Sequence, residues 1–256
     1  MRKGFVRRLI CAAAMLVAAQ ASASPFEPEL KQNAAPPTTG PFPFVLFAGS
    51  ELDPWNRYAT GGFKLRPFHA LGKDGFIILA AAGGGVWRET RDLALNRESD
   101  SRKFGAYALA GTELAIAGGS LGLFAGPEYF RETATDPRGV VLRRERRVGL
   151  RAHADWWSHP TERMLLTANA AAGSARKDIW MRLAFGWGLG AKGSPWGFAG
   201  PEISYYASPD STKARIGLHW SELGRGGFRF RISGGLSKES GRKPGAYLTI
   251  GGYWAM

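Results

Sequence analysis

The sequence predicts an all-β protein, an antiparallel transmembrane β-barrel of about 12 strands. Three observations favour this fold class from residue 44 onward: glycine is frequent, aromatic residues occur throughout, and apolar residues alternate with small or polar ones in runs of about ten residues. Helices would not tolerate glycine at this density. A barrel of 10 strands is the nearest alternative.

The first residues have the features of a secretory signal peptide. A basic start (MRKGFVRR) precedes an apolar stretch that is too short to span a membrane, and the small-residue pattern Ala21-Ser22-Ala23 follows. We therefore expect a signal peptide at 1–23, whose cleavage removes Cys11, the only cysteine. Residues 24–43 are rich in proline without apolar periodicity, which predicts an extended leader on the periplasmic side.

The alternating runs give twelve candidate strands. In 179–189, for example, Ile179, Met181 and Leu183 share one face, while Arg182 and Ala184 share the other. The predicted strands are 44–54, 57–67, 75–89, 103–116, 120–131, 143–157, 163–173, 178–190, 196–207, 213–222, 227–238 and 246–256. They make up a predicted barrel domain of 44–256.

The connections between these strands fall into two classes. With a periplasmic amino terminus, one side has mostly tight turns, and the other has the longer polar loops 90–102 and 132–142. Short periplasmic turns and longer external loops are typical of outer-membrane barrels. Tryptophans near the predicted periplasmic ends, and Trp55, Trp87, Tyr129 and Tyr205 near the external ends, predict two aromatic girdles. A soluble periplasmic β-sandwich, the alternative, rarely has so apolar a face beside one of Gly, Ala and Arg.

The pentapeptide FAGPE occurs at 124–128 and 198–202, and FAGSE occurs at 47–51. The apolar parity changes across each copy, for example from Phe198 to Ile203. We predict a one-residue bulge in each copy, because glycine and proline fit an interrupted ladder. Each bulge would turn its glutamate, Glu51, Glu128 or Glu202, into the lumen.

Parity predicts a charged lumen. The carboxylates are Glu51, Glu128, Glu202 and Asp155, and the cations include Lys64, Arg66, Arg147, Arg151, Arg182, Lys213, Arg215, Arg229 and Arg231. Two interpretations stay open: a rigid plug of ion pairs, or a selectivity ring lining a solvated pore.

Two further sets of residues are candidates for ligand contact. Arg143, Arg144 and Arg146 enter a strand from an external loop and are candidates for contact with lipopolysaccharide phosphates. Trp157 and Trp180 face inward by parity and are candidates for stacking on glucan. The chain is basic, with 34 Lys+Arg against 21 Asp+Glu. We expect outer-membrane lipid and lipopolysaccharide as partners, and no nucleic acid.

The sequence offers no catalytic constellation. His153 and Asp155 share a face, but no serine nucleophile is placed beside them. No cluster has metal-ligand spacing, so we expect neither metal nor cofactor. A non-enzymatic role is expected; an outer-membrane lipid-modifying enzyme and a general small porin or structural barrel are the alternatives.

The runs FVLFAGSELD, DGFIILAAAGGGVWRE, SLGLFAGPEYF, WGFAGPEISYYA and GAYLTIGGYWAM, with the segment 154–190, resemble the bacterial cellulose biosynthesis protein BcsS family. The resemblance covers most of 44–256. It implies an outer-membrane barrel linked to cellulose biosynthesis or secretion, either porin-like or a scaffolding partner of the cellulose synthase and export machinery. It brings no catalytic residues.

Overall fold

The structure is a computed structural model of the 256-residue chain. It describes residues 44–67, 74–92, 97–116, 118–191, 194–224 and 227–255. The predicted signal peptide (1–23) and the predicted leader (24–43) lie outside these ranges. Among the described residues, no helix is long and apolar enough to cross a membrane.

Twelve strands account for nearly all of the described chain. They are β1 Phe44–Leu52, β2 Asn56–Leu65, β3 Gly75–Asp92, β4 Arg97–Ile116, β5 Gly119–Thr135, β6 Val141–Thr161, β7 Met164–Gly173, β8 Asp178–Ala191, β9 Ser194–Ala207, β10 Thr212–Leu223, β11 Phe228–Glu239 and β12 Gly245–Ala255. Twelve strands are therefore confirmed over ten, and most boundaries agree with the prediction to within two residues.

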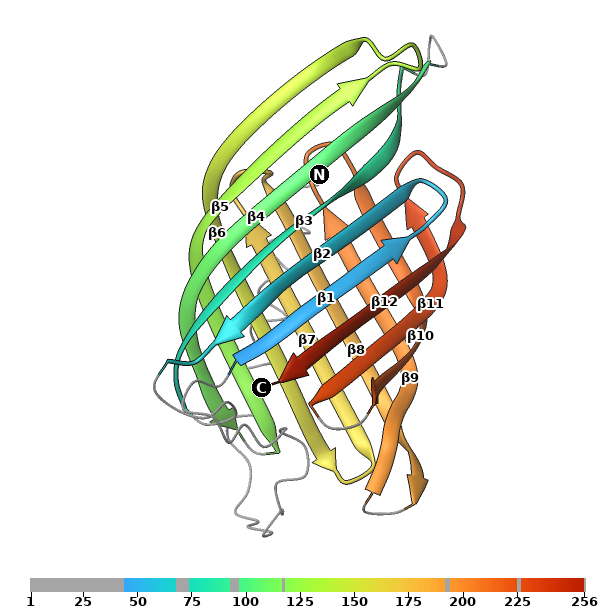
Figure 1. Ribbon diagram of the computed structural model, residues 1–256. Coiled ribbons are helices and arrows are strands. Elements are labelled where there is room, and N and C mark those ends of the chain that lie inside the picture. Colours follow the sequence, from blue (N-terminus) through green and yellow to red (C-terminus); the bar gives the residue numbers. More distant parts are fainter. Residues whose placement is uncertain are drawn as a thin grey trace, which may run out of the picture. The chain divides into compact units, whose positions relative to one another are not determined.

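These strands form one closed antiparallel barrel (Figure 1). Each strand pairs with its neighbours in sequence, and β1 pairs with β12 from Val45 opposite Ala255 to Leu52 opposite Leu248. Closure satisfies the backbone groups that a sheet edge would leave free. We call the end where β1 begins and β12 finishes the terminal end, and the opposite end, which carries the turns 53–55 and 136–140, the hairpin end.

The two longest hairpins differ from the prediction. The segments 90–102 and 132–142, predicted as loops, are mostly strand, because β3 pairs with β4 out to Asp92 opposite Arg97, and β5 pairs with β6 out to Thr135 opposite Val141. In Figure 1 strands β3 to β6 rise above the rest of the barrel. In the sequence, 97–102 (RESDSR) and 132–135 (ETAT) contain no large apolar residue, so they lack the apolar alternation by which strands are recognised.

Side chains alternate between the lumen and an apolar outer surface. On β6, Val148 and Leu150 face outward and are 78% and 70% exposed, whereas Arg151 and Asp155, further along the strand, face the lumen. Large apolar side chains are exposed on most strands. An outer surface of this kind suits lipid rather than water.

The three bulges predicted in the repeated pentapeptides are absent. Pairing runs without a register shift through 47–51 and from 119 to 134, and alternation is unbroken through 124–128. Phe47, Phe124 and Phe198 face the lumen together with the glutamates four residues later, as residues four apart do in a regular strand. The prediction fails because it assigns these phenylalanines to the lipid-facing side, whereas they fill the interior.

Register shifts occur at other places. One lies between Leu189 and Gly190 of β8, where Trp196 is the extra residue on β9. Another lies between Trp220 and Leu223 of β10. Glu222, within the second, has a φ of 60°. The face of β9 therefore does change between Trp196 and Ile203, but the change precedes the pentapeptide.

Tryptophans mark the outer rim of the terminal end. Trp187, Trp196 and Trp254 lie near that end and are each about half exposed, as expected for an interfacial aromatic girdle. At the hairpin end, Trp87 departs from the prediction. It faces inward, 5.7 Å from Tyr58 between ring centroids, with the Nζ of Lys103 5.2 Å from its ring.

Candidate functional site

The lumen at the terminal half of the barrel is filled by apolar side chains. Ile77, Leu79, Leu109 and Phe124 form a buried cluster and are at most 4% exposed, and Phe47 and Tyr107 pack against it. On the other side of the barrel, Leu165 and Phe198 are equally enclosed. Interior positions with almost no exposure are packed as in a protein core rather than hydrated as in a channel.

Contacts reach across the lumen and join strands that are far apart in the sheet. Lys64 of β2 forms a salt bridge with Asp155 of β6, and its Nζ lies 5.1 Å from the ring of Phe124. The ring of His159, near the end of β6, lies 5.0 Å from that of Phe198 on β9. These contacts place side chains in the interior between separate parts of the barrel wall.

The glutamates of the repeated pentapeptide lie on β1, β5 and β9, and each pairs with an arginine. Glu51 pairs with Arg215 of β10, and Glu202 pairs with Arg231 of β11. Glu128 accepts from Arg151 at 3.3 Å and from the backbone N–H of Ala175 at 2.7 Å. Because the carboxylates of Glu128 and Glu202 are buried, the charge-assisted bonds compensate for their desolvation.

Asp155 is the centre of a second cluster. Besides Lys64, it contacts the Nε2 of His153 at 2.5 Å and accepts from the Nδ2 of Asn169 at 3.1 Å. Asn169 in turn accepts from the Nη2 of Arg182 at 2.7 Å. The His153–Asp155 contact thus belongs to a structural network of donors around one carboxylate.

The remaining arginines of the predicted network also lie on the inner face. Arg66 is fully buried just beyond β2 and donates to Glu113 at 2.7 Å. Arg147 donates to Glu145 at 2.6 Å and its side chain is 44% exposed. Arg229, near the terminal end, donates to the carbonyl oxygen of Phe228 and lies 4.0 Å from Glu222.

Several acidic residues of the network are absent from the prediction. Glu113 and Glu132 face the lumen by simple alternation on β4 and β5, so parity could have identified them. Asp53 lies in the turn after β1, where it accepts from Lys213 at 2.8 Å and from Arg215 at 3.0 Å. Burial alone would raise the pKa of Asp53, but Lys213 and the bonds from Trp55 and Asn56 outweigh it and lower the pKa.

A polar cavity of about 310 Å³ lies at the hairpin end of the lumen. Residues of β3 to β6 and of β9 to β11 line it, together with the turns after β7, β9 and β11. We call it the vestibule. Its lining includes the aromatic residues Trp87, Phe130 and Tyr206, and six cationic and four anionic side chains.

The two tryptophans predicted to stack on glucan lie in the lumen outside the residues that line the vestibule. The ring of Trp157 packs edge-on against His159, with centroids 4.4 Å apart, toward the terminal end. Trp180 is opposite Tyr206 in register and lies beside Arg182, at 5.9 Å. Protein groups therefore contact both rings.

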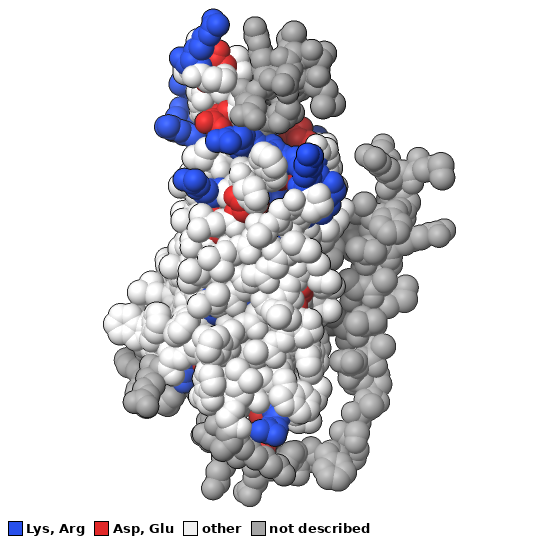
Figure 2. All heavy atoms as spheres, turned by 90° about the vertical axis from the view of Figure 1, so that its right-hand side faces the viewer, with Lys and Arg blue, Asp and Glu red and all other residues white. Residues whose placement is uncertain are grey.

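The arginines predicted to contact lipopolysaccharide separate onto two faces. Arg143 faces inward, forms a salt bridge with Glu132 and lines the vestibule, so an outward contact is not available to it. Arg144 and Arg146 face outward and are exposed. Arg146 is directly opposite Arg131 of β5. Figure 2 shows Lys and Arg gathered at the hairpin end, above a band with little charge.

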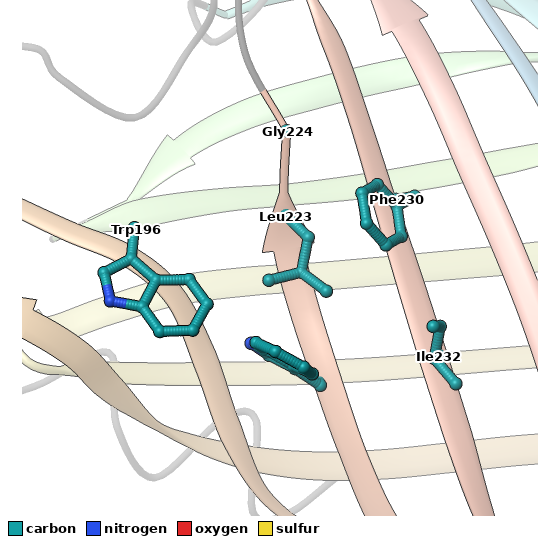
Figure 3. A pocket seen from close by; sticks show the side chains of 6 residues that line it. Trp196, Leu223, Gly224, Phe230 and Ile232 are labelled. Carbon is teal, nitrogen blue, oxygen red and sulfur yellow. The ribbon is translucent and has the colours of Figure 1, made fainter.

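The outer surface carries an apolar groove near the terminal end of β9 to β11 (Figure 3). Trp196, Trp220, Leu223, Phe230 and Ile232 line it, and its volume is about 540 Å³. The rings of Trp196 and Trp220 meet edge-on at 5.2 Å. The groove lies where the register of β10 shifts, and it belongs to the lipid-facing surface. Within the described ranges, no group of three or more His, Cys, Asp or Glu residues could hold a metal ion.

A closed barrel with an apolar outer belt and an interior of paired charges defines the protein as a membrane-type β-barrel. In a comparison with known protein families, the model of the cellulose biosynthesis protein BcsS family matches residues 45–254. The chain belongs to this family. No match was found among curated proteins.

Solved structures that are similar to this chain include distant β-barrels. The β-domain of the Bordetella autotransporter BrkA is 10% identical, with 85% of this chain and 100% of that chain covered and a TM-score of 0.48. The transport unit of the Escherichia coli autotransporter AIDA-I is 10% identical, covering 94% and 96%, with a TM-score of 0.42. The translocator domain of NalP from Neisseria meningitidis is 11% identical, covering 98% and 96%, with a TM-score of 0.35.

Proposed function

We propose that the protein is a closed, non-enzymatic outer-membrane barrel that serves cellulose biosynthesis as a scaffold rather than as a channel. The family membership supports the link to cellulose. The observation that carries the scaffolding role is the filled lumen, in which the buried cluster around Leu109 and Phe124 is continued by the salt bridge of Lys64 and Asp155. A porin-like role, the alternative, would require these contacts to separate.

The proposed placement is the outer membrane, with the hairpin end outside. The apolar outer surface would face lipid, and short turns at the terminal end would face the periplasm, as in other barrels of this kind. Arg144 and Arg146 would then stand at the height of the outer-leaflet phosphates. No acidic partner contacts them within the described part of the chain, so they are available to anionic lipid and lipopolysaccharide.

Single-channel recording of the refolded mature protein in a planar bilayer tests the proposal. We expect no steady conductance, with folding verified by heat-modifiable gel mobility. A steady current through the wild-type barrel, interrupted by cello-oligosaccharide, would refute the scaffolding role and support a glucan-conducting pore.

A matched pair of variants makes the same test specific to the lumen. Phe124→Ala removes a lumenal ring that is 4% exposed, whereas Leu123→Ala removes a neighbouring side chain on the outer face that is 45% exposed. We expect current leaks from Phe124→Ala and none from Leu123→Ala. Equal behaviour of the two would mean that the apolar cluster does not close the barrel.

A deletion strain separates this function from a lipid-modifying enzyme. Loss of the scaffold should change the amount or anchoring of cellulose and leave lipid A and phospholipid unchanged. Altered lipid with normal cellulose would contradict the proposal.

A further inference from the structure

The vestibule has the composition of a binding site rather than that of a solvated channel mouth. Its aromatic rings come from three separate strands, with Trp87 on β3, Phe130 on β5 and Tyr206 on β9. The guanidinium of Arg176 is held between two of them, 4.6 Å from the ring of Phe130 and 5.6 Å from that of Tyr206. Stacking fixes this guanidinium in the cavity wall, where its N–H groups are oriented in advance.

Most of the charges of the vestibule are paired with one another. Arg143 is bound to Glu132, and Arg147 donates to Glu145 at 2.6 Å. Glu239 lies 3.7 Å from both Lys213 and Arg242. A cavity built for an anion would leave cations without carboxylate partners, as the outer face does at Arg144 and Arg146. This wall instead offers donors beside acceptors.

Such a wall matches a neutral polyhydroxyl ligand. Each sugar hydroxyl both donates and accepts, so it can bond to a guanidinium and to a carboxylate at once. The C–H faces of a pyranose ring are apolar and can lie on an aromatic side chain. Some donors are also left over; for example, the Nη1 of Arg242 is buried at the cavity and has no hydrogen-bond partner among the described residues.

We propose that the vestibule binds a short stretch of β-glucan at the hairpin end of the barrel, with Trp87 as a stacking platform. This inference rests on the proposed function, because the family membership is what makes glucan the relevant polyhydroxyl. The cavity is near the lower limit of roughly 300–1,000 Å³ for ligand pockets, which suits a few sugar units rather than a threaded chain. Glucan contact is thereby assigned to the vestibule instead of to Trp157.

Calorimetric titration of the full mature protein with cellopentaose tests the site. We expect saturable binding to the wild type, about three- to tenfold weaker binding to Trp87→Ala from the loss of one aromatic contact, and about tenfold weaker binding to Glu145→Gln from the loss of a charged acceptor. Trp254→Ala, on the outer face, is the control and should bind as the wild type does. Glu145 is partly exposed, so its variant should fold even if Trp87→Ala does not.

Three results would overturn the assignment. The folded wild type could fail to bind cellopentaose. Binding could be lost in Trp157→Ala and kept in Trp87→Ala, which would place the ligand at the other end of the lumen. An acidic oligogalacturonide of equal length could bind more tightly and in a strongly salt-dependent manner, which would make the vestibule an anion site. Conductance is measured separately, so an open barrel that binds cellopentaose refutes only the closed lumen.

Discussion

The glycine of the repeated pentapeptide lets neighbouring strands approach each other, and substitution by alanine tests this at three equivalent positions. Gly126, Gly200 and Gly49 occupy the same place in the three copies, facing the lumen. A Cβ added at Gly126 would lie 2.2 Å from the carbonyl oxygen of Ala108, and one at Gly200 would lie 2.1 Å from that of Phe185. At Gly49 the nearest atom, the carbonyl oxygen of Ile250, would be 3.3 Å away.

These distances predict different costs for the same substitution. At Gly126 and Gly200 the obstacle is backbone, so the strands must separate by roughly 1 Å, and overpacking of this kind costs about 1–3 kcal/mol. At Gly49 a shift of a few tenths of an ångström suffices. There, the lower conformational freedom of alanine in the unfolded chain contributes about 0.4–1 kcal/mol of stability and offsets the strain.

Reversible urea unfolding in lipid vesicles, followed by tryptophan fluorescence, measures the free energy of unfolding of each variant. We expect Gly126→Ala and Gly200→Ala to lose about 2 kcal/mol or more and Gly49→Ala to stay within about 0.5 kcal/mol of the wild type. Heat-modifiable mobility confirms that each variant forms a barrel. Equal stability of all three variants would refute the reasoning, because sequence alone does not distinguish these glycines.

Three further predictions concern charge. Glu202→Gln removes the partner of Arg231 from a site where the glutamate side chain is 5% exposed and should cost about 3–5 kcal/mol in urea unfolding. Glu145→Gln, whose closer partner Arg147 is 44% exposed, should cost less than about 1 kcal/mol. Similar losses from the two variants would contradict this difference. Because the pKa of Asp53 is lowered, its bonds to Lys213 and Arg215 stabilise the fold above pH 3.8, and this stabilisation is lost as pH falls further. Asp53→Asn should therefore flatten the decline of the free energy of unfolding at acid pH. An unchanged slope in the variant would exclude the Asp53 carboxylate as a source of that decline. Replacing Arg144 and Arg146 with serine should weaken association with lipopolysaccharide vesicles about tenfold or more, at about 1 kcal/mol per cation. Lys238→Ser, on another hairpin, should weaken it less. A larger effect of Lys238→Ser would show that lipid binding does not depend on the arginines of β6.

Period-two alternation was sufficient to predict the barrel because a closed sheet between two environments imposes it on every strand. It located all twelve strands and placed Arg151, Arg182 and Arg231 on the inner face. It failed at Phe124 and Phe198, because alternation shows which residues share a face and not which face meets lipid. An apolar residue inside a filled lumen has the same pattern as one outside.

The partners of the charged residues could not be predicted from alternation. Lys64 and Asp155 are 91 positions apart, and they meet only because β2 and β6 face each other across the interior. Arg66 and Glu113 are likewise 47 positions apart and meet only in the folded barrel. Glu132 lies one residue past the predicted strand end at 131, so its inward position follows only if the alternation is extended. A list of lumenal charges therefore could not show which were paired or where a cavity would remain.

The order of layers along the lumen restricts where recognition can occur. From the terminal end, the apolar cluster around Leu109 and the salt bridge of Lys64 and Asp155 come first. The buried pair of Glu202 and Arg231 follows, and the vestibule opens only at the hairpin end. A solute arriving from the terminal side meets packed side chains, whereas one arriving from the hairpin side meets a cavity with donors and acceptors. The outward arginines, Arg144 and Arg146, lie at that same end. Recognition by this barrel should therefore depend on its hairpins, and exchanging them between family members should transfer glucan and lipid preference while leaving the closed lumen intact.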